Sequence, residues 1–140
     1  MNHPVFYLET GSQNPYYNLA FEEFVLTHRV EGDYLILWQN DNTIVIGQNQ
    51  NAEEEINRSF VEAHQIHVVR RSTGGGAVYH DLGNLNYSFI TDAGEDKLTF
   101  KRFTGPIVEA LKAKGYRLAC YTYENGKYRD MNSAGSRRPS

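Results

Sequence analysis

The sequence predicts an α+β fold, a largely antiparallel sheet with helices packed on it. Short apolar runs of strand length alternate with longer segments of helical apolar spacing, and clusters of Asn, Asp and Gly separate them. The length of 140 residues fits one domain. We expect residues 1–123 to form this domain. Residues 124–140 are polar, lack apolar periodicity and are predicted to be a disordered or unrelated tail.

The first half of the chain predicts one strand, two helices and a hairpin. Residues 5–9 alternate and predict a strand. Asn14 is suited to cap the helix that follows, and Pro15 suits its first position, where a missing N–H costs nothing. Two β-rich runs flank the residues QNDN, so residues 34–47 are predicted to form a hairpin. Three glutamates near the start of residues 51–64 predict the second helix.

The second half continues the same alternation. Residues 66–70, 77–81 and 85–90 are β-rich and predict three strands. Residues 99–115 have a helical apolar face, with Pro106 expected to kink the helix or to mark a restart, and Gly115 expected to end it. Residues 116–123 predict one more strand. On the first helix, Glu22 and Glu23 lie off the apolar stripe and are expected on a solvated face.

Composition argues against several classes of protein. A net charge of −3 does not suit a nucleic-acid partner or an anionic membrane surface, and the apolar runs are too short to span a bilayer. The start of the chain has no secretory signal, and a single cysteine, Cys120, fits a reducing compartment, so we expect a cytoplasmic protein. Cys120 alternates with tyrosines and is predicted to be a core residue. His64 and His67 lack partners at zinc-ligand spacing.

The stretch RRSTGGGAVYHD, residues 70–81, is the strongest functional signal in the chain. Three consecutive glycines permit positive φ and remove every Cβ, so another molecule can lie against the backbone. Successive N–H groups in such a turn bind anions, and two arginines add forked donors suited to phosphate or carboxylate. A triple glycine is also compatible with a plain hairpin turn flanked by solvated arginines. No G-K-S/T follows, so the stretch is not a Walker loop.

Three segments together indicate a family. NLAFEE (residues 18–23), LWQNDNTIVIGQNQN (residues 37–51) and RRSTGGGAVYHDLGNLNYSF (residues 70–89) resemble, in that order, segments of the lipoate–protein ligase A family, which belongs with biotin–protein ligases and lipoyl or octanoyl transferases. The resemblance covers residues 5–115. It implies the N-terminal part of a class II synthetase-like biotin/lipoate-ligase catalytic domain.

The resemblance implies an enzyme that uses ATP to convert lipoic acid to lipoyl-adenylate and then passes the lipoyl group to a lysine of a carrier domain. The implied carriers are E2 subunits of 2-oxoacid dehydrogenases and the H protein of the glycine cleavage system. Magnesium would accompany ATP, but no residue is indicated as its ligand. The resemblance places the acyl side of the ligand against Arg70, His80 and Asn84. It places the nucleotide against seven residues of the motif: Arg71, Gly74, Gly75, Gly76, Ala77, Val78 and Tyr79.

The chain departs from the family pattern after Gly115. The family continues with a GRND-like strand and a lysine that is followed by a small residue and glycine, and that lysine contacts both the phosphate and the acyl carbonyl. Lys127 stands in a faintly similar setting, but no glycine follows three residues later. We therefore expect this chain to have crippled ligase activity. Two alternatives stay open: an acyl transferase that moves octanoyl or lipoyl groups without ATP, and a non-catalytic fragment.

Overall fold

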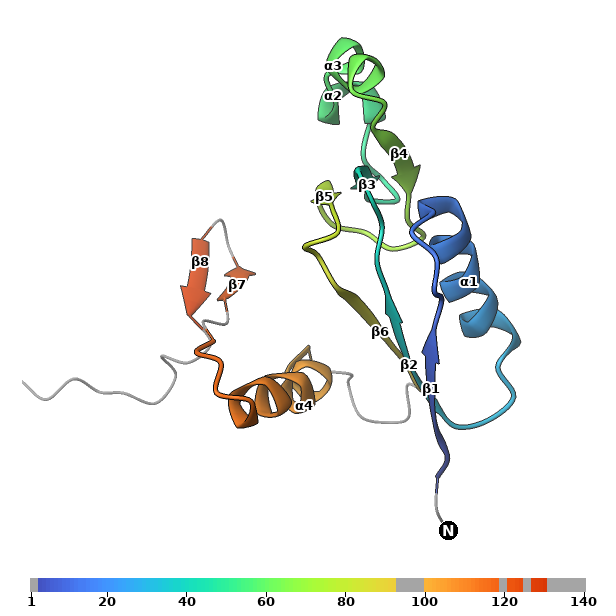
Figure 1. Ribbon diagram of the computed structural model, residues 1–140, viewed down its shortest axis with the longest axis vertical. Coiled ribbons are helices and arrows are strands. Elements are labelled where there is room, and N and C mark those ends of the chain that lie inside the picture. The colour runs from blue at the N-terminus through green and yellow to red at the C-terminus, as the bar shows by residue number, and fades with distance from the viewer. Residues whose placement is uncertain (1–2, 93–99, 119–120, 125–126, 131–140) are drawn as a thin grey trace, which may run out of the picture. The chain divides into compact units, whose positions relative to one another are not determined.

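The computed structural model describes residues 3–92, 100–118, 121–124 and 127–130. They belong to two compact units, residues 1–92 and residues 93–140, which are described separately. The fold is α+β, and three of the five strand pairings are antiparallel, so the predicted fold class is confirmed (Figure 1). Within the described residues, no helix is long and apolar enough to cross a membrane.

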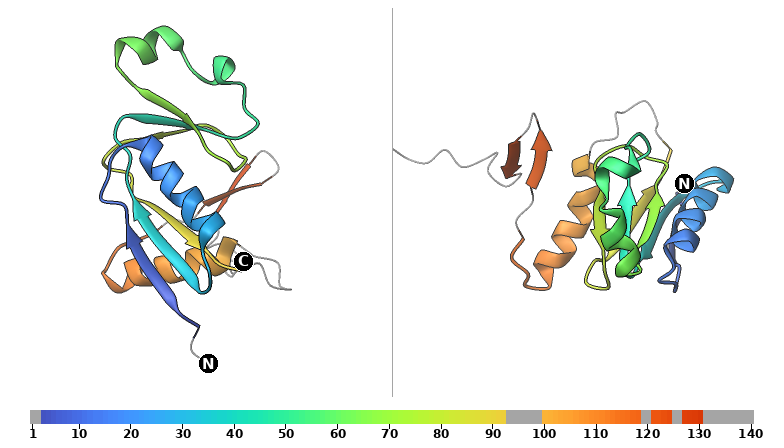
Figure 2. Two further views of the ribbon diagram at one scale, coloured as in Figure 1. Left: turned by 90° about the vertical axis from the view of Figure 1, so that its right-hand side faces the viewer. Right: turned by 90° about the horizontal axis from the view of Figure 1, so that it is seen from above.

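The first sheet of the larger unit has the order β1-β2-β6. Strands β1 (Val5–Glu9) and β2 (Asp33–Trp38) run parallel, and β6 (Asn86–Ile90) runs antiparallel to β2. Helix α1 (Pro15–His28) packs on one face of this sheet (Figure 2). The buried core between them consists of Val25, Ile36, Trp38 and Ile90. This core fixes α1 against the sheet, and α1 in turn supplies one wall of the site described below.

The start of α1 is as the sequence predicts. The side chain of Asn14 accepts hydrogen bonds from the backbone N–H of Tyr16 at 2.9 Å and of Tyr17 at 3.3 Å. Pro15 occupies the first helical position and is buried. Because the cap satisfies two N–H groups that have no partner within the helix, it defines where α1 begins.

The second sheet has the order β4-β3-β5, and Figure 1 shows it above the first sheet. Its central strand β3 (Thr43–Ile46) is parallel to β4 (His67–Arg70) and antiparallel to β5 (Val78–His80). Two short helices, α2 (Ala52–Glu55) and α3 (Arg58–Ala63), connect β3 to β4. The sequence predicted one helix here. The first of these helices ends before Ile56. Asn57 is extended and its side chain accepts a hydrogen bond from the N–H of Phe60, so a new helix starts there.

The predicted hairpin at residues 34–47 is wrong, because β2 and β3 belong to different sheets. The polar residues between them do not form a tight turn; they make tertiary contacts. Gln39 donates to the carbonyl oxygen of Leu82 at 3.0 Å, and Asn40 is fully buried among other polar side chains. Asn and Asp favour turns, but their side chains serve equally well as buried hydrogen-bonding groups, and here that role prevails.

The smaller unit contains α4 (Phe100–Ala113) and the antiparallel pair β7 (Tyr121–Glu124) and β8 (Lys127–Asp130). Pro106 lies inside α4 without ending it. Gly115 has a φ of +86°, and the N–H of Tyr116 bonds to the carbonyl oxygen of Leu111, so the predicted helix stop is confirmed. Residues 127–130 form a strand although the sequence predicted a tail without structure from residue 124. The domain boundary at residue 123 stays a prediction.

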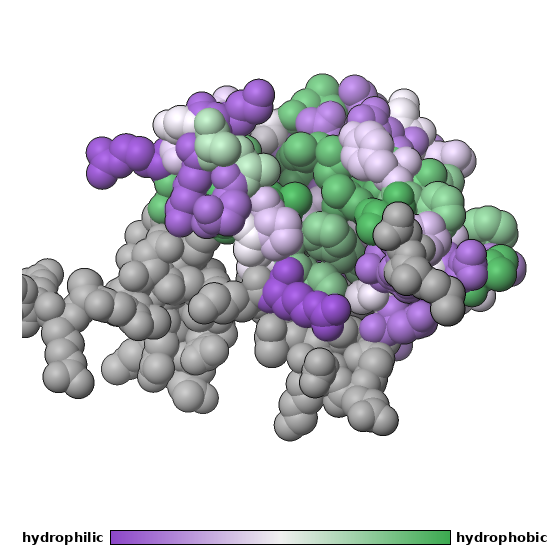
Figure 3. Space-filling view, turned by 90° about the horizontal axis from the view of Figure 1, so that it is seen from below, coloured by the Kyte–Doolittle hydropathy of each residue, from purple (hydrophilic) through white to green (hydrophobic). Residues whose placement is uncertain are grey.

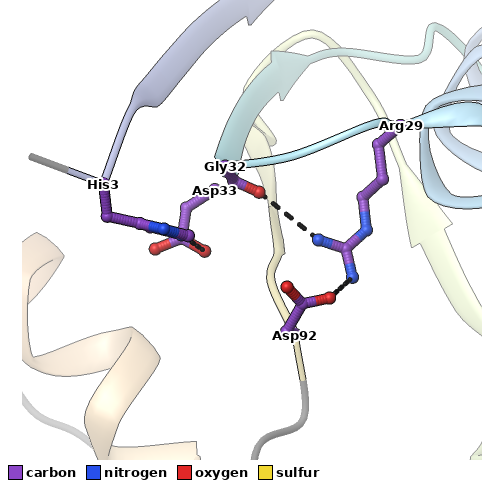
Figure 4. Close-up of polar contacts among 5 residues, drawn as sticks. All are labelled: His3, Arg29, Gly32, Asp33 and Asp92. Carbon is purple, nitrogen blue, oxygen red and sulfur yellow. Dashed lines mark hydrogen bonds and ion pairs between the residues drawn. The ribbon is translucent and has the colours of Figure 1, made fainter. Parts of the chain in front are cut away.

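Polar contacts gather where β2 begins and β6 ends (Figure 4). Arg29 donates to the carboxylate of Asp92 at 2.6 Å and to the carbonyl oxygen of Gly32 at 3.3 Å, and His3 lies 3.2 Å from Asp33.

Hydrophobic side chains also reach the surface, and Figure 3 shows a group of them among hydrophilic neighbours. In β1 the side chains of Val5 and Tyr7 are more than half exposed.

Candidate functional site

A cavity of about 400 Å³ lies between α1, the strands of both sheets and the residues that follow β4. Its apolar wall is formed by seven side chains: Leu19, Leu26, Trp38, Val45, Val78, Phe89 and Ile90. Four charged residues also line it. Glu22 and Glu23 come from α1, and Arg70 and Arg71 come from the end of β4. The cavity is therefore apolar in its body and carries opposite charges from two different elements, which suits a ligand with a long apolar part and an anionic group.

Residues 71–77, which connect β4 to β5 and are called the glycine segment below, fold around the guanidinium group of Arg71. Nη2 donates to the carbonyl oxygens of Gly74 and Gly76, both at 2.8 Å, and Nη1 donates to the carbonyl oxygen of Val45 at 3.3 Å. Arg70 clamps the neighbouring loop: its Nη1 lies within 3.1 Å of the carbonyl oxygens of three residues, Gly47, Gln48 and Gln50. Both arginines are thus fixed by backbone carbonyls. They hold positive charge at the cavity wall in defined positions.

The three glycines have different physical requirements. Gly75 has a φ of +101°, and a Cβ there would lie 2.8 Å from Nη2 of Arg71, so it is the residue around which the segment turns. Gly47 packs against it: a Cβ on Gly47 would lie 2.1 Å from the carbonyl oxygen of Gly75. A Cβ on Gly74 or Gly76 would meet no atom within 4 Å. These two residues therefore leave the backbone open to another molecule.

The glycine segment is not a hairpin turn. This excludes the alternative that the three glycines only form a turn between two paired strands. Strands β4 and β5 do not pair with each other; they lie on opposite sides of β3. The segment therefore crosses over the end of β3, where the N–H of Gln48 bonds to the carbonyl oxygen of Thr73 at 2.9 Å. The arginines are not merely solvated, since both bind the backbone of this crossing.

A polar chain joins α1 to the sheet along one wall of the cavity. The indole N–H of Trp38 donates to Oγ of Ser88 at 3.0 Å, and that hydroxyl donates to the carboxylate of Glu22. Glu22 is therefore half-buried and bonded to the sheet, not fully solvated as expected, whereas Glu23 is exposed as predicted. The contact holds the ring of Trp38 in a fixed orientation at the cavity.

His80 is the titratable group of this wall whose ionisation is perturbed. Its side chain is 7 % exposed. Burial lowers the pKa of His80 below its ordinary value, and the positive charge of Arg71 lowers it further. The imidazole is accordingly held in its neutral form near pH 7. Among the described residues, no group of three His, Cys, Asp or Glu side chains is arranged to hold a metal ion.

The structure brings some of the predicted site residues together and separates others. Arg70, Arg71, Val78 and His80 line the cavity. Tyr79 points to the other face of β5, where its hydroxyl donates to Asn42 at 2.9 Å and it lines a second cavity with Phe60. Four other predicted residues do not line the cavity, although Ser72 and Thr73 just before them do: Gly74, Gly75, Gly76 and Ala77. Asn84 does not line it either.

The side chains of two predicted residues lie outside the part of the chain that the structure describes. The backbone of Lys127 begins β8, but its side chain lies outside the described part, so its role as the family lysine stays a prediction. Cys120 lies outside the described residues altogether. The sequence did not identify Trp38, Ser88 or the buried asparagines as site residues. They belong to no local motif, and only the tertiary fold brings them together.

The chain matches the model of the lipoyl protein ligase A/B catalytic domain over residues 14–131, and it belongs to that family. It is 51 % identical over 104 residues to lipoate–protein ligase 1 of Staphylococcus aureus, and 53 % identical over 104 residues to the lipoate–protein ligase LplJ of Bacillus subtilis. Each alignment covers 73 % of this chain, but only 32 % and 31 % of the relatives. The chain thus spans about a third of the length of these relatives.

Solved structures agree with this assignment. A crystal structure of lipoate–protein ligase A bound with ATP superposes with a TM-score of 0.67 at 31 % identity and covers 82 % of this chain and 48 % of its own. A putative lipoate–protein ligase of T. acidophilum with bound lipoic acid gives a TM-score of 0.66 at 31 % identity, with 82 % and 49 % covered. A bipartite archaeal ligase studied with its E2 lipoyl domain gives 0.68 at 29 % identity, covering 89 % and 49 %.

Proposed function

We propose that this chain carries the ligand-binding part of a lipoate–protein ligase, which activates lipoic acid with ATP to lipoyl-adenylate and transfers the lipoyl group to a lysine of a lipoyl carrier domain. The observation that carries the proposal is the continuity of one apolar cavity with the glycine segment and its two arginines. Membership of the family and likeness to a ligase with bound ATP and to one with bound lipoic acid support it.

The geometry suits the two halves of an acyl-adenylate. The apolar wall with Trp38 would take the hydrocarbon tail and ring of lipoate by burial of apolar surface. The adenylate would lie against the open backbone of Gly74 and Gly76, where no Cβ intervenes. The positive charge of Arg71 at that point would stabilise negative charge on the phosphoryl and carbonyl oxygens, which is the usual source of catalysis in such sites.

The wider system follows from the same proposal. The acceptors would be lipoyl domains of E2 subunits of 2-oxoacid dehydrogenases or the H protein of the glycine cleavage system, and one neighbouring structure is of a ligase with an E2 lipoyl domain. Magnesium would arrive with the nucleotide, since it is commonly held by phosphate oxygens and one or two carboxylates. Glu22 and Glu23 are the carboxylates that line the cavity. We expect the reaction to take place in the cytoplasm.

Calorimetric titration of the 140-residue chain tests the proposal. A non-hydrolysable analogue of lipoyl-adenylate should bind more tightly than lipoate or ATP alone, because it occupies both parts of the site. Gly74→Val should abolish this gain while leaving the fold intact, since the new side chain enters open space. A transferase that works without ATP would bind the acyl part and gain nothing from the adenylate. Absence of binding, or equal binding by the Gly74 variant, would contradict the proposal.

A further inference from the structure

Two chains of asparagine amides end on the same ring nitrogen of His80. Nδ1 of His80 lies 3.2 Å from Nδ2 of Asn40 and 3.5 Å from Nδ2 of Asn86. Asn40 is in contact with Asn18, and Asn86 with Asn84. Asn18 and Asn40 are completely buried, so the contacts of the first chain are shielded from water. The direction of the hydrogen bonds in the first chain can be followed from groups that only accept.

The first chain starts at backbone carbonyl oxygens. Nδ2 of Asn18 lies 2.9 Å from the carbonyl oxygen of Ser12 and 2.7 Å from that of Gln39. Carbonyl oxygens only accept, so this end of the Asn18 amide is its NH₂ group. The same NH₂ group is 2.9 Å from Oδ1 of Asn40. Asn40 therefore turns its oxygen to Asn18 and its own NH₂ group to His80, where it has to donate.

The second chain agrees with this result, although no backbone carbonyl anchors it. Nδ2 of Asn84 donates to Oδ1 of Asn86 at 3.0 Å, which leaves the NH₂ group of Asn86 facing His80. Both neighbours thus present N–H groups to Nδ1. This nitrogen can only accept, because a proton on it would face two other donors.

Burial and charge favour the same state. Desolvation and the nearby guanidinium of Arg71 both lower the pKa of His80, so the ring is neutral. The other charged groups that line the cavity are Arg70, Glu22 and Glu23. A neutral ring whose Nδ1 accepts keeps its proton on Nε2.

We propose that Asn18 and Asn40 are positioning residues that hold His80 as the neutral Nε2–H tautomer, so that the cavity offers a hydrogen-bond donor, and not a base, to an oxygen of its ligand. Nδ1 is occupied by the amides, which leaves Nε2 as the ring nitrogen for a bound molecule. A neutral imidazole donor beside Arg71 adds hydrogen bonding without a second positive charge, as neutral histidines do in other enzymes that polarise a carbonyl. Only the part that concerns the ligand rests on the proposed function.

Nitrogen-15 NMR of the histidine-labelled chain tests the tautomer directly and requires no ligand. The wild-type chain at pH 7 should give His80 a protonated-type Nε2 and an unprotonated-type Nδ1. The reverse pattern, or an equal mixture of the two tautomers, would overturn the proposal even if the chain binds lipoate. Failure of the proposed function would leave this spectrum unchanged, so the two failures are distinguishable.

Asn40→Asp supplies the matched perturbation. The new carboxylate has the shape of the amide but can only accept, so the His80 proton should move to Nδ1, and the pKa of His80 should rise by about one unit or more. Asn57→Asp adds the same charge at the cap of α3, where the side chain is exposed and bonds to Ser59 and Phe60, and should change neither. An Asn40 variant that keeps the wild-type tautomer would contradict the proposal.

The same pair of variants tests the role toward the ligand. At a pH above the raised pKa, where the His80 ring is neutral and its proton is on Nδ1, Asn40→Asp should weaken binding of the lipoyl-adenylate analogue by about tenfold or more, because Nε2 no longer donates to the ligand oxygen. Asn57→Asp should bind like the wild-type chain. Wild-type affinity in a folded Asn40 variant whose tautomer has switched would show that His80 does not donate to the ligand.

Discussion

The close approach of Gly47 to the glycine segment predicts that a single methyl group will disrupt the site. A Cβ on Gly47 would lie 2.1 Å from the carbonyl oxygen of Gly75 and 3.3 Å from Nη2 of Arg71. Carbon contacts become favourable only near 3.5 Å, so the two backbones would have to separate by more than about 1 Å. Neither can yield easily, because Gly47 is buried and accepts from Arg70 while Gly75 is the turning point of its segment.

The expected cost of Gly47→Ala follows from its burial. Overpacking a well-packed site by one methyl group costs about 1–3 kcal/mol. For a unit of this size, each kcal/mol lowers the melting temperature by about 4–8 °C. Gly74→Ala is the matched control: it adds the same methyl group to the glycine segment that Gly47 contacts, but into space with no atom within 4 Å. We expect the control to unfold like the wild-type chain.

Urea denaturation followed by tryptophan fluorescence measures both variants. Trp38 is the single tryptophan, is 9 % exposed in the folded chain and lines the cavity, so its emission reports on this unit. Gly47→Ala should shift the midpoint to lower urea with an unchanged slope. Equal midpoints for the two variants would refute the inferred packing of the glycine segment against Gly47.

Three further predictions concern ionisation, an ion pair and catalysis. Because the folded-state pKa of His80 lies below the unfolded value near 6.5, the unfolded chain binds this proton first; stability should be full above pH 6.5 and fall as the pH drops below it, and urea titrations of His80→Gln should show a flatter dependence. Asp92→Asn should cost less than about 1 kcal/mol in the same assay, since its carboxylate is largely exposed beside Arg29; a larger loss would show that the pair anchors the end of β6. The 140-residue chain should form lipoyl-adenylate at least about a hundredfold more slowly than a full-length relative, because it lacks a lysine in the family setting and a fixed cation contributes several kcal/mol there. Mass-spectrometric detection of adenylate in a single turnover checks this, and comparable rates that vanish in Lys127→Ala would identify Lys127 as the missing group.

The sequence predicted the elements better than their arrangement. The cap at Asn14, the stop at Gly115 and the strands around the glycine segment follow from local chemistry, and the structure contains them. The predicted pairing of β2 and β3 was wrong because consecutive strands usually pair, and nothing in the local sequence shows that these two join different sheets. The spacing of apolar residues also did not show that α2 and α3 are separate helices divided at Asn57.

Some residues of the site could likewise be predicted from the sequence, and others could not. Arg70, Arg71 and His80 were identifiable because they belong to one continuous motif, and all three line the cavity. Trp38 and Ser88 are 50 residues apart in sequence and meet only through the pairing of β2 with β6. Residues that act through long-range contacts of this kind carry no local signal, so the polar wall of the cavity could be found only from the fold.

The most direct test of the central claim is to map which residues sense the ligand. Amide and indole chemical shifts of the 140-residue chain would be followed during titration with the lipoyl-adenylate analogue. The largest changes should appear at residues 74–76, whose open backbone we propose to lie against the adenylate, and at the indole N–H of Trp38, which lines the cavity. Changes that cluster instead around Phe60, in the second cavity beside α3, or no saturable changes at all, would contradict the claim that this cavity is the ligand site.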